Sequence, residues 1–278
     1  MNVFQQYQKL RPKLKSIAEP IGFVATMGAL HDGHLSLVKK ALTENTHVVV
    51  SIFVNPTQFD DPHDLDKYPR PLANDLQLLK AFENSISVYT PSVLDVYGAS
   101  PVMNTYDFGS LADTMEGVCR KNHFNGVGTV VEKLLRLLTP DTAYFGEKDF
   151  QQLQIIRSLV QQKKISTTIV GVPIVREEDG LAMSSRNQLL NPSQRGAASV
   201  IYETLLMIRS QFKKISLKDM HSKVTKIFEK NAHFKLDYFT IAEEESLLEP
   251  NEILNDRNYR AFIAVKARRI RLIDNIKL

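Results

Sequence analysis

The stretch GFVATMGALHDGHLSLV, residues 22–38, decides the fold class of this chain. It follows Ile21 with a short apolar run of the length of a buried strand, passes through a glycine-bearing turn, and ends in LSLVKKAL, whose apolar residues recur at helical spacing. A strand, a tight turn and a helix in this order are typical of an open α/β sheet. In such a sheet, ligands bind beyond the carboxyl ends of the strands.

The same alternation continues to about residue 174. HVVVSIFV (47–54) predicts a strand that is apolar on both faces, which suits a parallel sheet covered by helices on each side. Further strands and helices are predicted in turn: a helix at 3–17, a helix at 72–82, a strand near 85–90, a helix at 126–138, a strand at 141–145, a helix at 150–164 and a strand at 166–175. This order predicts an α/β fold with a Rossmann-like, doubly wound parallel sheet.

After about residue 175 the chain changes character. A polar, turn-rich stretch leads to predicted helices at about 193–213 and 217–231, and strand-like pieces follow them. Helices grouped before strands predict a smaller α+β unit, so we expect domains at 1–174 and 175–278. AVKARRIRLI, residues 264–273, resembles an edge strand with a basic outer face.

Composition narrows the class of protein. The 278 residues are 43% hydrophobic and 24% charged, which excludes a disordered, collagenous or coiled-coil chain. No apolar run approaches the ~18 residues of a membrane span, and the first residues lack the apolar core of a secretory signal. The single cysteine, Cys119, excludes a disulfide framework. We therefore expect a cytoplasmic protein with no membrane partner.

The charge balance leaves two kinds of partner open. The formal net charge is +4, and both signs are interspersed except in the tail, where Lys266, Arg268, Arg269 and Arg271 gather. Nucleic-acid-binding proteins usually concentrate such charge in a patch or stripe. An anionic small substrate fits the balance at least as well, so we expect no nucleic-acid partner.

Two histidines at the first predicted helix start are the leading candidates for chemistry. His31 and His34 are three residues apart and can face one ligand. Gly28 and Gly33 allow the backbone to approach a phosphate, and a helix start presents N–H groups to it. Imidazoles there can stabilise charge that develops in a transition state. The alternatives are two unrelated surface histidines, or a zinc pair that lacks an obvious third ligand nearby.

Two later segments offer further groups that suit phosphate. In YFGEKDFQQLQII (144–156), Lys148 follows a strand end and a glycine, whereas Asp149 could simply be a helix N-cap. Gln151 and Gln152 lie on different helix faces, so at most one should enter a pocket. GLAMSSRN (180–187) provides two hydroxyls and a guanidinium that could grip a polyphosphate, although the same stretch could be an ordinary polar loop.

The segment after the strongest strand predicts polar contacts over the sheet. In FVNPTQF (53–59), Gln58 offers both donors and acceptors to a ligand. The acidic stretch that follows, 59–76, suggests Mg²⁺ contacts from Asp75 or its neighbours, although most of these aspartates suit a solvated loop.

Taken in order, these motifs closely resemble the pantothenate synthetase (pantoate–β-alanine ligase) family. The motifs are TMGALHDGH, VNPTQF, YPR, MEGVCR with HFNGVGTVV, YFGEKDFQQ, REEDGLAMSSRN and RLIDN, which together extend from about residue 21 to 275. The family belongs to the wider HxGH nucleotidyltransferases. An HxGH enzyme acting on a phosphorylated acceptor is the nearest alternative, but it would lack the pair Gln58 and Gln152.

The resemblance implies a two-step reaction. ATP and pantoate form a bound pantoyl adenylate and pyrophosphate with Mg²⁺ as cofactor, and β-alanine then attacks to give pantothenate and AMP. His34 would be the proton donor, with His31 and Lys148 as further catalytic residues. Gln58 and Gln152 would hold pantoate, and Gln58 also β-alanine. The residues that would contact ATP are Met27, Gly28, Ala29, Leu30, His31, Asp32, Gly33, His34, Gly146, Glu147, Lys148, Asp149, Val175, Met183, Ser184, Ser185 and Arg186.

Some positions depart from the family pattern, and they bear on loop rigidity near 60–66 and 120–125 rather than on the expected catalytic residues. Ala25 stands for a proline, His63 for a glutamate, Lys121 and Asn122 for a proline and a glycine, and Gly128 for an alanine. The resemblance also implies a homodimer. The strand HVVVSIFV could equally be central core or interface.

Overall fold

The computed structural model describes residues 1–17, 20–59 and 62–278. The chain divides into two compact units. Unit 1 comprises Met1–Glu147 and Gln151–Pro173, and unit 2 comprises Lys148–Phe150 and Ile174–Leu278. The tripeptide 148–150 therefore belongs with the C-terminal unit, although its neighbours on both sides belong to the first.

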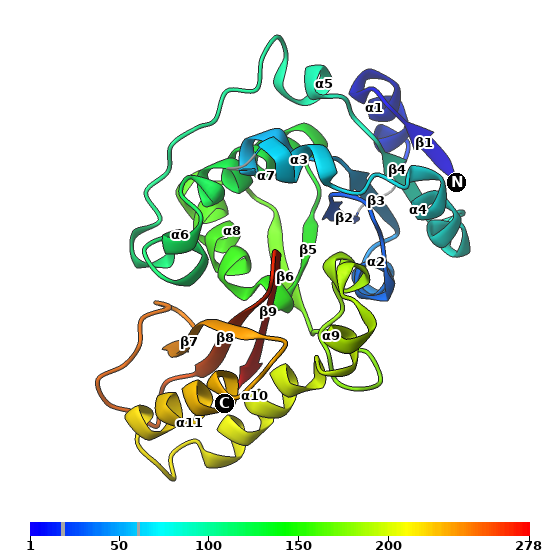
Figure 1. Cartoon of the computed structure of the whole chain (residues 1–278). Helices are drawn as coiled ribbons and strands as arrows, with labels where there is room; N and C mark the ends of the chain where they lie inside the picture. The colour runs from blue at the N-terminus through cyan, green and yellow to red at the C-terminus, as the bar shows by residue number, and fades with distance from the viewer. Residues whose placement is uncertain (18–19, 60–61) are drawn as a thin grey trace. The chain divides into compact units, whose positions relative to one another are not determined.

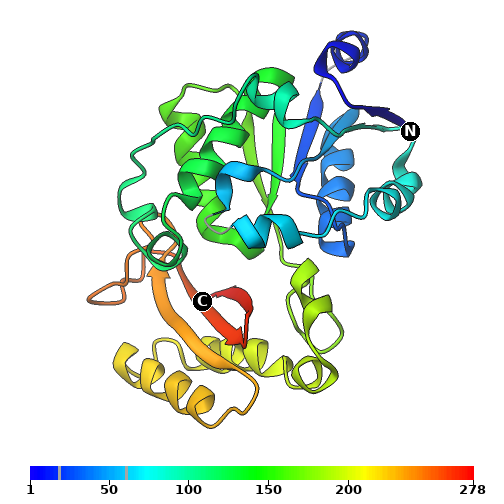
Figure 2. The same cartoon turned by 45° about the horizontal axis from the view of Figure 1, so that its top comes forward.

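A six-stranded parallel sheet forms the centre of unit 1 (Figures 1 and 2). The strands run in the order β1-β4-β3-β2-β5-β6 across the sheet. Their bounds are β1 Asn2–Phe4, β2 Ile21–Thr26, β3 His47–Ile52, β4 Ile86–Tyr89, β5 Thr142–Gly146 and β6 Thr168–Val172. Every pairing between neighbours is parallel, which confirms the predicted doubly wound sheet.

Helices cover both faces of this sheet. α2 (Asp32–Glu44) and α4 (Leu72–Leu79) lie on one side, and α7 (His123–Leu138) and α8 (Phe150–Gln162) lie on the other (Figures 1 and 2). The connection after β2, through α2, crosses one face of the sheet. The connection after β5, through α8, crosses the other face. The strand order therefore reverses between β2 and β5, and a doubly wound sheet binds its ligand beyond the carboxyl ends at such a point.

β3 is central core. It pairs with β2 on one side and β4 on the other, and Val48, Val49 and Val50 are fully buried. Burial on both faces explains why the sequence HVVVSI has no polar alternation, and each buried valine contributes about 1.5 kcal/mol or more.

The remaining short elements connect these layers. They are α1 Tyr7–Lys15, α3 Pro62–Lys67, α5 Val93–Tyr97, α6 Met115–Cys119, and the 3₁₀ turns η1 Pro56–Gln58, η2 Lys80–Phe82, η3 Gly109–Leu111 and η4 Glu147–Asp149. The single helix predicted at 3–17 was wrong in its first part. Residues 2–4 instead pair with Ser87, Val88 and Tyr89 as strand β1, because an exposed edge of β4 is available to them.

Unit 2 is an antiparallel three-stranded sheet, β7-β8-β9, with two helices packed on it. The strands are β7 Lys235–Glu243, β8 Tyr259–Ala267 and β9 Ile270–Lys277, and the helices are α10 Ser199–Gln211 and α11 Leu217–Glu229. Side chains of α10, α11 and the sheet form one buried core that includes Ile201, Leu205, Val224 and Ile263. This architecture confirms the predicted smaller α+β unit.

Two predicted segments of unit 2 divide differently. The helix expected at 193–213 is α9 (Pro192–Gly196) followed by α10, because the Asn191–Gln194 capping box starts a single short turn that closes at Ala197. The expected edge strand at 264–273 is the end of the central strand β8, a turn at Arg268 with φ +56°, and the edge strand β9. Two successive antiparallel strands each alternate polar and apolar residues, so in the sequence they resemble one strand.

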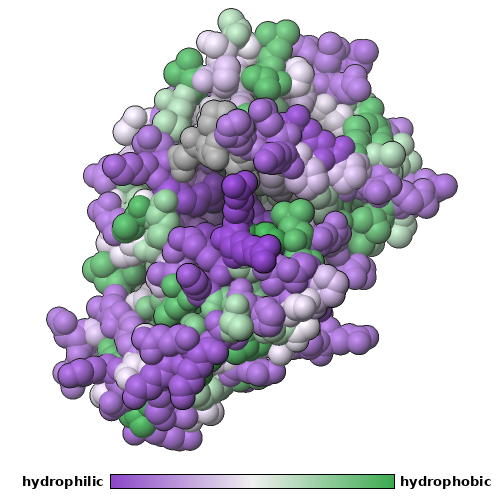
Figure 3. Space-filling model, in the orientation of Figure 1, coloured by the Kyte–Doolittle hydropathy of each residue, from purple (hydrophilic) through white to green (hydrophobic). Residues whose placement is uncertain are grey.

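On the face shown in Figure 3, hydrophilic side chains predominate and hydrophobic ones form small groups. Within the described part of the chain, no helix combines the length and the apolarity needed to cross a membrane.

Candidate active site

A tight turn leaves the carboxyl end of β2 toward helix α2. The Thr26 hydroxyl donates to the Ser51 carbonyl (2.8 Å) and accepts from the Gly28 N–H (3.3 Å). Gly28 has φ +83° and Ala29 φ +50°, so both residues lie in the left-handed region. A Cβ on Gly28 would meet Asp75 Oδ2 at 3.0 Å and Ile52 Cγ2 at 3.2 Å. Glycine is required there both by its backbone angle and by the close approach of these side chains.

Asp75 holds this turn from α4. Its carboxylate is 1% exposed and accepts hydrogen bonds from the N–H groups of Leu30 (2.7 Å) and Ala29 (3.0 Å). Burial raises the pKa of Asp75, and the two backbone hydrogen bonds limit that rise. Each oxygen accepts one backbone N–H, so Asp75 supports the turn, and its predicted Mg²⁺ contact stays a prediction. Among the described residues, no group of three or more His, Cys, Asp or Glu side chains could hold a metal ion, and residues 60 and 61 of the acidic stretch lie outside them.

The two histidines form a capping box at the start of α2. His31 is the N-cap, and its Nδ1 accepts from the Gly33 N–H (3.1 Å). His34 Nδ1 accepts from the His31 N–H (3.3 Å). A backbone N–H can only donate, so each Nδ1 is unprotonated and the proton of each neutral ring is on Nε2. The ring centroids are 4.1 Å apart, which places two imidazole N–H donors together at one helix N-terminus.

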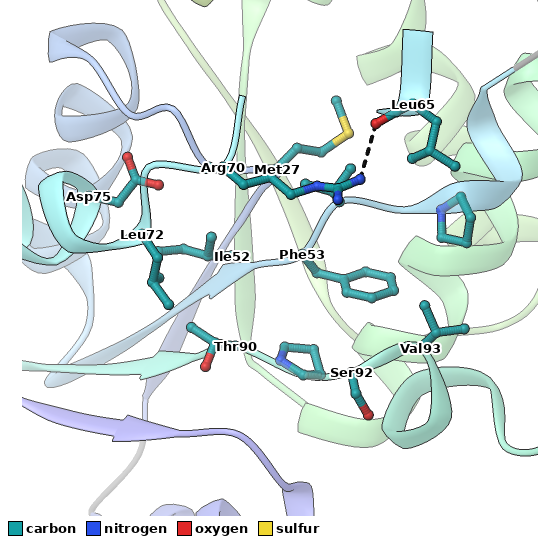
Figure 4. Close-up of a pocket in the computed structure, with 14 residues that line it drawn as sticks. Met27, Ile52, Phe53, Leu65, Arg70, Leu72, Asp75, Thr90, Ser92 and Val93 are labelled. Carbon is teal, nitrogen blue, oxygen red and sulfur yellow. Dashed lines mark hydrogen bonds between the residues drawn. The ribbon is translucent and has the colours of Figure 1, made fainter. Parts of the chain in front are cut away.

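A cavity of about 420 Å³ lies beside the same turn in unit 1 (Figure 4). Its wall is mostly apolar, with side chains from the ends of β2, β3 and β4 such as Met27, Ile52 and Phe53. The Arg70 side chain also lines the cavity, and its Nη2 donates to the Leu65 carbonyl (3.0 Å). The cavity has the size of a small-molecule site.

Gln58 is buried at the end of η1, 8% exposed. Its Nε2 lies 3.2 Å from Met27 Sδ, so the structure brings the predicted acid-binding glutamine to the predicted nucleotide turn. Its backbone carbonyl accepts from Arg120 Nη2 (3.3 Å) and is 3.0 Å from His123 Nδ1. Helix α7 packs tightly on η1, since a Cβ on Gly126 would lie 2.2 Å from the Thr57 carbonyl oxygen.

The start of α8 separates the two glutamines in the predicted way. Gln151 is buried, accepts from the Glu116 N–H (3.0 Å) and donates to the carbonyls of Leu111 (2.8 Å) and Thr114 (2.9 Å). It is therefore a structural residue. Gln152 is half-buried on another face of the helix and belongs to unit 1, as do Gly146 and Glu147.

In unit 2, the segment with Lys148 and Asp149 is tied to strand β9. Asn275 is 1% exposed and its Nδ2 donates to the Lys148 carbonyl (2.9 Å). The neighbouring Asp274 accepts two hydrogen bonds from Arg176 (2.6 and 3.0 Å). The terminal motif RLIDN thus holds both the Lys148 segment and the strand-like stretch that leads to Met183.

The polar loop of unit 2 is folded by its own hydrogen bonds. The Val175 carbonyl accepts from the Met183 N–H (3.0 Å), and Ser184 Oγ caps η5 (Ser185–Leu189) by accepting from the Arg186 N–H (3.3 Å). Met183, Ser184, Ser185 and Arg186 are all half-buried. Asn187 donates to Glu177 Oε1 (2.6 Å), and Glu177 in turn pairs with Arg195. The loop is an ordered hydroxyl- and guanidinium-bearing surface.

The predicted site residues therefore form two sets. Unit 1 contains the turn and histidines 27–34, Gln58, Asp75, Gly146, Glu147 and Gln152. Unit 2 contains Lys148, Asp149, Val175 and 183–186. Sequence reasoning did not single out Asn55, Arg120 or His123, which contact Gln58, or Tyr97, which contacts Asn55. The sequence signal that could have identified Asn55 was a polar residue directly after a strongly apolar strand.

The departures from the family pattern have local explanations. Asn122 has φ +63°, a conformation that asparagine tolerates better than most residues in place of glycine. Gly128 faces the Tyr106 ring, which a Cβ would meet at 3.0 Å. Ala25 lies within β2, and His63 and Lys121 are exposed.

A helix N-terminus with two imidazole donors, beyond the carboxyl ends of parallel strands, is a site for phosphate groups. The turn before it lets a ligand approach the backbone closely, and the sheet reverses its order at the same edge. These features place the chain among the nucleotide-binding α/β proteins.

Within that class, the chain belongs to the pantoate-beta-alanine ligase family, whose model matches residues 2–277. It is 48% identical over 281 residues to the pantothenate synthetase of Flavobacterium psychrophilum, with 100% of each chain covered. It is 49% identical to that of Christiangramia forsetii, with 100% of this chain and 99% of the relative covered. The predicted family, the predicted ligase function and the prediction that the chain is an enzyme are confirmed.

Solved structures agree with this assignment. The pantothenate synthetase of Thermus thermophilus superposes with a TM-score of 0.91 at 38% identity, covering 100% of this chain and 99% of that one. The pantoate-beta-alanine ligase of Francisella tularensis, solved as a complex with beta-gamma ATP and beta-alanine, gives 0.81 at 36% identity, covering 100% and 97%.

Proposed function

We propose that this chain joins pantoate to β-alanine at the expense of ATP. A pantoate carboxylate oxygen attacks the α-phosphorus of ATP, and pyrophosphate leaves with the electrons of the broken P–O bond. The β-alanine amine then attacks the acyl carbon of the adenylate, loses a proton and expels AMP. Membership of the ligase family and the relative solved with beta-gamma ATP and beta-alanine support this proposal.

The observation that carries the proposal is the pair of histidines. With both Nδ1 atoms accepting backbone N–H groups, His31 and His34 each direct their N–H donor from Nε2. Such donors stabilise the negative charge that grows on the departing phosphate oxygens. The proton-donor role that the resemblance implies for His34 would also require its ring to be charged, since a neutral imidazole does not give up its Nε2 proton. The turn at Gly28 and the N-terminus of α2 would add backbone N–H groups to the same phosphates.

Other residues would hold and enclose the substrates. Gln58 and Gln152 would bind pantoate, and Gln58 also β-alanine. Lys148 would place a positive charge on the phosphates, and Ser184, Ser185 and Arg186 would provide hydroxyl and guanidinium donors to them. The remaining nucleotide contacts would come from 27–33, Gly146, Glu147, Asp149, Val175 and Met183. The enzyme would act mainly by positioning and charge stabilisation.

Mg²⁺ would reach the site with ATP. The described residues offer no cluster of three acidic or histidine ligands, and Asp75 is occupied by backbone N–H groups. This donor set fits an ion held mainly by phosphate oxygens and water, which is the usual coordination of Mg²⁺ at nucleotides. When bound, it would neutralise phosphate charge.

A homodimer and a cytoplasmic location are further proposals from the family resemblance. Light scattering after size-exclusion chromatography would test the first: a mass of twice the 31.5 kDa chain supports it, and a single-chain mass contradicts it. Fractionation of the source cells would test the second.

Replacing His34 tests the catalytic assignment. His34→Ala should slow adenylate formation about 10²–10³-fold, the cost of a lost transition-state donor, and should change ATP affinity far less. The exposed His233→Ala is the matched control and should behave as wild type. A His34→Ala rate close to that of wild type would remove His34 from the chemical step.

A further inference from the structure

The hydrogen bonds around Gln58 determine which end of its side-chain amide faces a ligand. Asn55 lies between Gln58 and Tyr97 and is 1% exposed. Its Nδ2 lies 3.2 Å from the Gly126 carbonyl, and its Oδ1 lies 2.6 Å from the Tyr97 hydroxyl and 3.4 Å from the Thr57 N–H. A carbonyl can only accept and an N–H can only donate, so the orientation of the Asn55 amide is fixed.

The orientation of Gln58 follows from that of Asn55. Asn55 Nδ2 donates to Gln58 Oε1 (3.1 Å), so the acceptor of the Gln58 amide is already engaged by the protein. Gln58 Nε2 lies on the other side of the amide, 3.2 Å from Met27 Sδ, which is a weak acceptor. The side chain therefore directs a hydrogen-bond donor toward the nucleotide turn.

Tyr97 completes this arrangement from the end of α5. Its hydroxyl makes the shortest contact of Asn55 and is also 3.1 Å from Thr57 Oγ1. Burial raises the pKa of Tyr97, so the hydroxyl stays protonated and able to donate at neutral pH. The ring packs 6.3 Å from that of Phe53, and Lys133 Nζ lies 5.3 Å from its centroid. The ring contacts and the hydroxyl contact are thus separable by mutation.

We propose that Tyr97 is a positioning residue for the acid substrate, because through Asn55 it holds the Gln58 amide with its NH₂ group toward the bound acid. The site then selects an oxygen acceptor, such as a carboxylate or hydroxyl oxygen, at that point and rejects an analogue that presents an N–H donor there. This inference rests on the proposed binding of pantoate by Gln58.

Tyr97→Phe is the direct test, since it removes only the hydroxyl. We expect the KM for pantoate to rise about 3- to 10-fold, the effect of one lost neutral hydrogen bond. The KM for ATP should stay unchanged. Tyr106→Phe is the matched control, because it removes a hydroxyl whose partners are Glu132 (2.8 Å) and Asn104 (3.3 Å) rather than Asn55.

A double mutant separates positioning from general stability. In a Gln58→Ala background there is no amide left to orient, so adding Tyr97→Phe should not raise the pantoate KM further. A purely structural role predicts instead that the second mutation adds its full effect and that the ATP KM rises too. Either of these results, or a Tyr97→Phe enzyme with the pantoate KM of wild type, overturns the proposal.

Measurements on the wild-type enzyme distinguish a wrong role for Tyr97 from a wrong proposed function. Wild-type protein that shows no pantoate-dependent turnover of ATP would refute the ligase reaction itself. Active wild-type protein with an unaffected Tyr97→Phe variant would refute only the role of Tyr97.

Discussion

Asp75→Asn tests whether this aspartate of the acidic stretch 59–76 supports the nucleotide turn or binds metal. The replacement keeps the shape of the side chain but removes its charge. Its Oδ1 can still accept from the Leu30 N–H, whereas an NH₂ group in place of Oδ2 would face the Ala29 N–H. One backbone donor of a buried turn is then left without an acceptor.

The structure sets the size of the effect. Two hydrogen bonds to a charged acceptor contribute about 1.5–3 kcal/mol each. Burial of the carboxylate at 1% exposure offsets part of that, as the raised pKa of Asp75 indicates. We expect Asp75→Asn to lower the free energy of unfolding by about 1–3 kcal/mol, the cost of one unsatisfied buried donor. If displacement of the turn weakens ATP binding by about 1.4 kcal/mol, the KM for ATP rises about tenfold.

The assay compares urea unfolding, the KM for ATP at saturating Mg²⁺, and the Mg²⁺ concentration at half-maximal rate. Asp66→Asn is the control, since Asp66 is an exposed aspartate of the same stretch. A supporting aspartate predicts lower stability and a higher KM for ATP with unchanged Mg²⁺ dependence. Wild-type stability together with a strongly raised Mg²⁺ requirement would refute this reasoning and restore Asp75 as a metal ligand.

Two further predictions concern unit 2. Asn275→Ala should reduce stability by about 1–3 kcal/mol and raise the KM for ATP, because the Lys148 carbonyl loses its donor; wild-type values in denaturation and steady-state assays would contradict this. Hydrogen bonding from Arg195 lowers the pKa of Asp179, so this pair stabilises the fold above the unfolded pKa of about 3.9 and loses its effect as the pH falls through the lower folded value. The difference in thermal midpoint between wild type and Asp179→Asn should therefore shrink below about pH 4, and a constant difference from pH 7 to 3 would contradict the linkage.

The parts of the fold that local pattern determines were predictable from the sequence. A run such as HVVVSI can only be stable when both faces are buried, and a strand followed by a glycine turn and a helix start indicates where phosphate can bind. The same reasoning placed His31 and His34 together, since a helix start fixes their separation. The observed capping box is a direct consequence of that spacing.

The missed features depend on long-range contacts. Strand β1 pairs with β4, which lies far along the chain, and three residues carry too little pattern to reveal it. Asp75 reaches Leu30 across 45 positions of sequence, and Tyr97 reaches Asn55 across 42. Tyr97 looks like an ordinary loop residue, and Asp75 like a candidate metal ligand, until the fold brings their partners close. Polar residues that become buried next to a predicted site are therefore the ones that sequence patterns identify least well.

Pyrophosphate–ATP isotope exchange without β-alanine tests the central claim most directly. The proposed adenylate can form and reverse with pantoate alone, so exchange should require pantoate and should be nearly abolished in His34→Ala. Exchange that proceeds equally without pantoate, or no exchange and no AMP even after β-alanine is added, would contradict the proposed reaction.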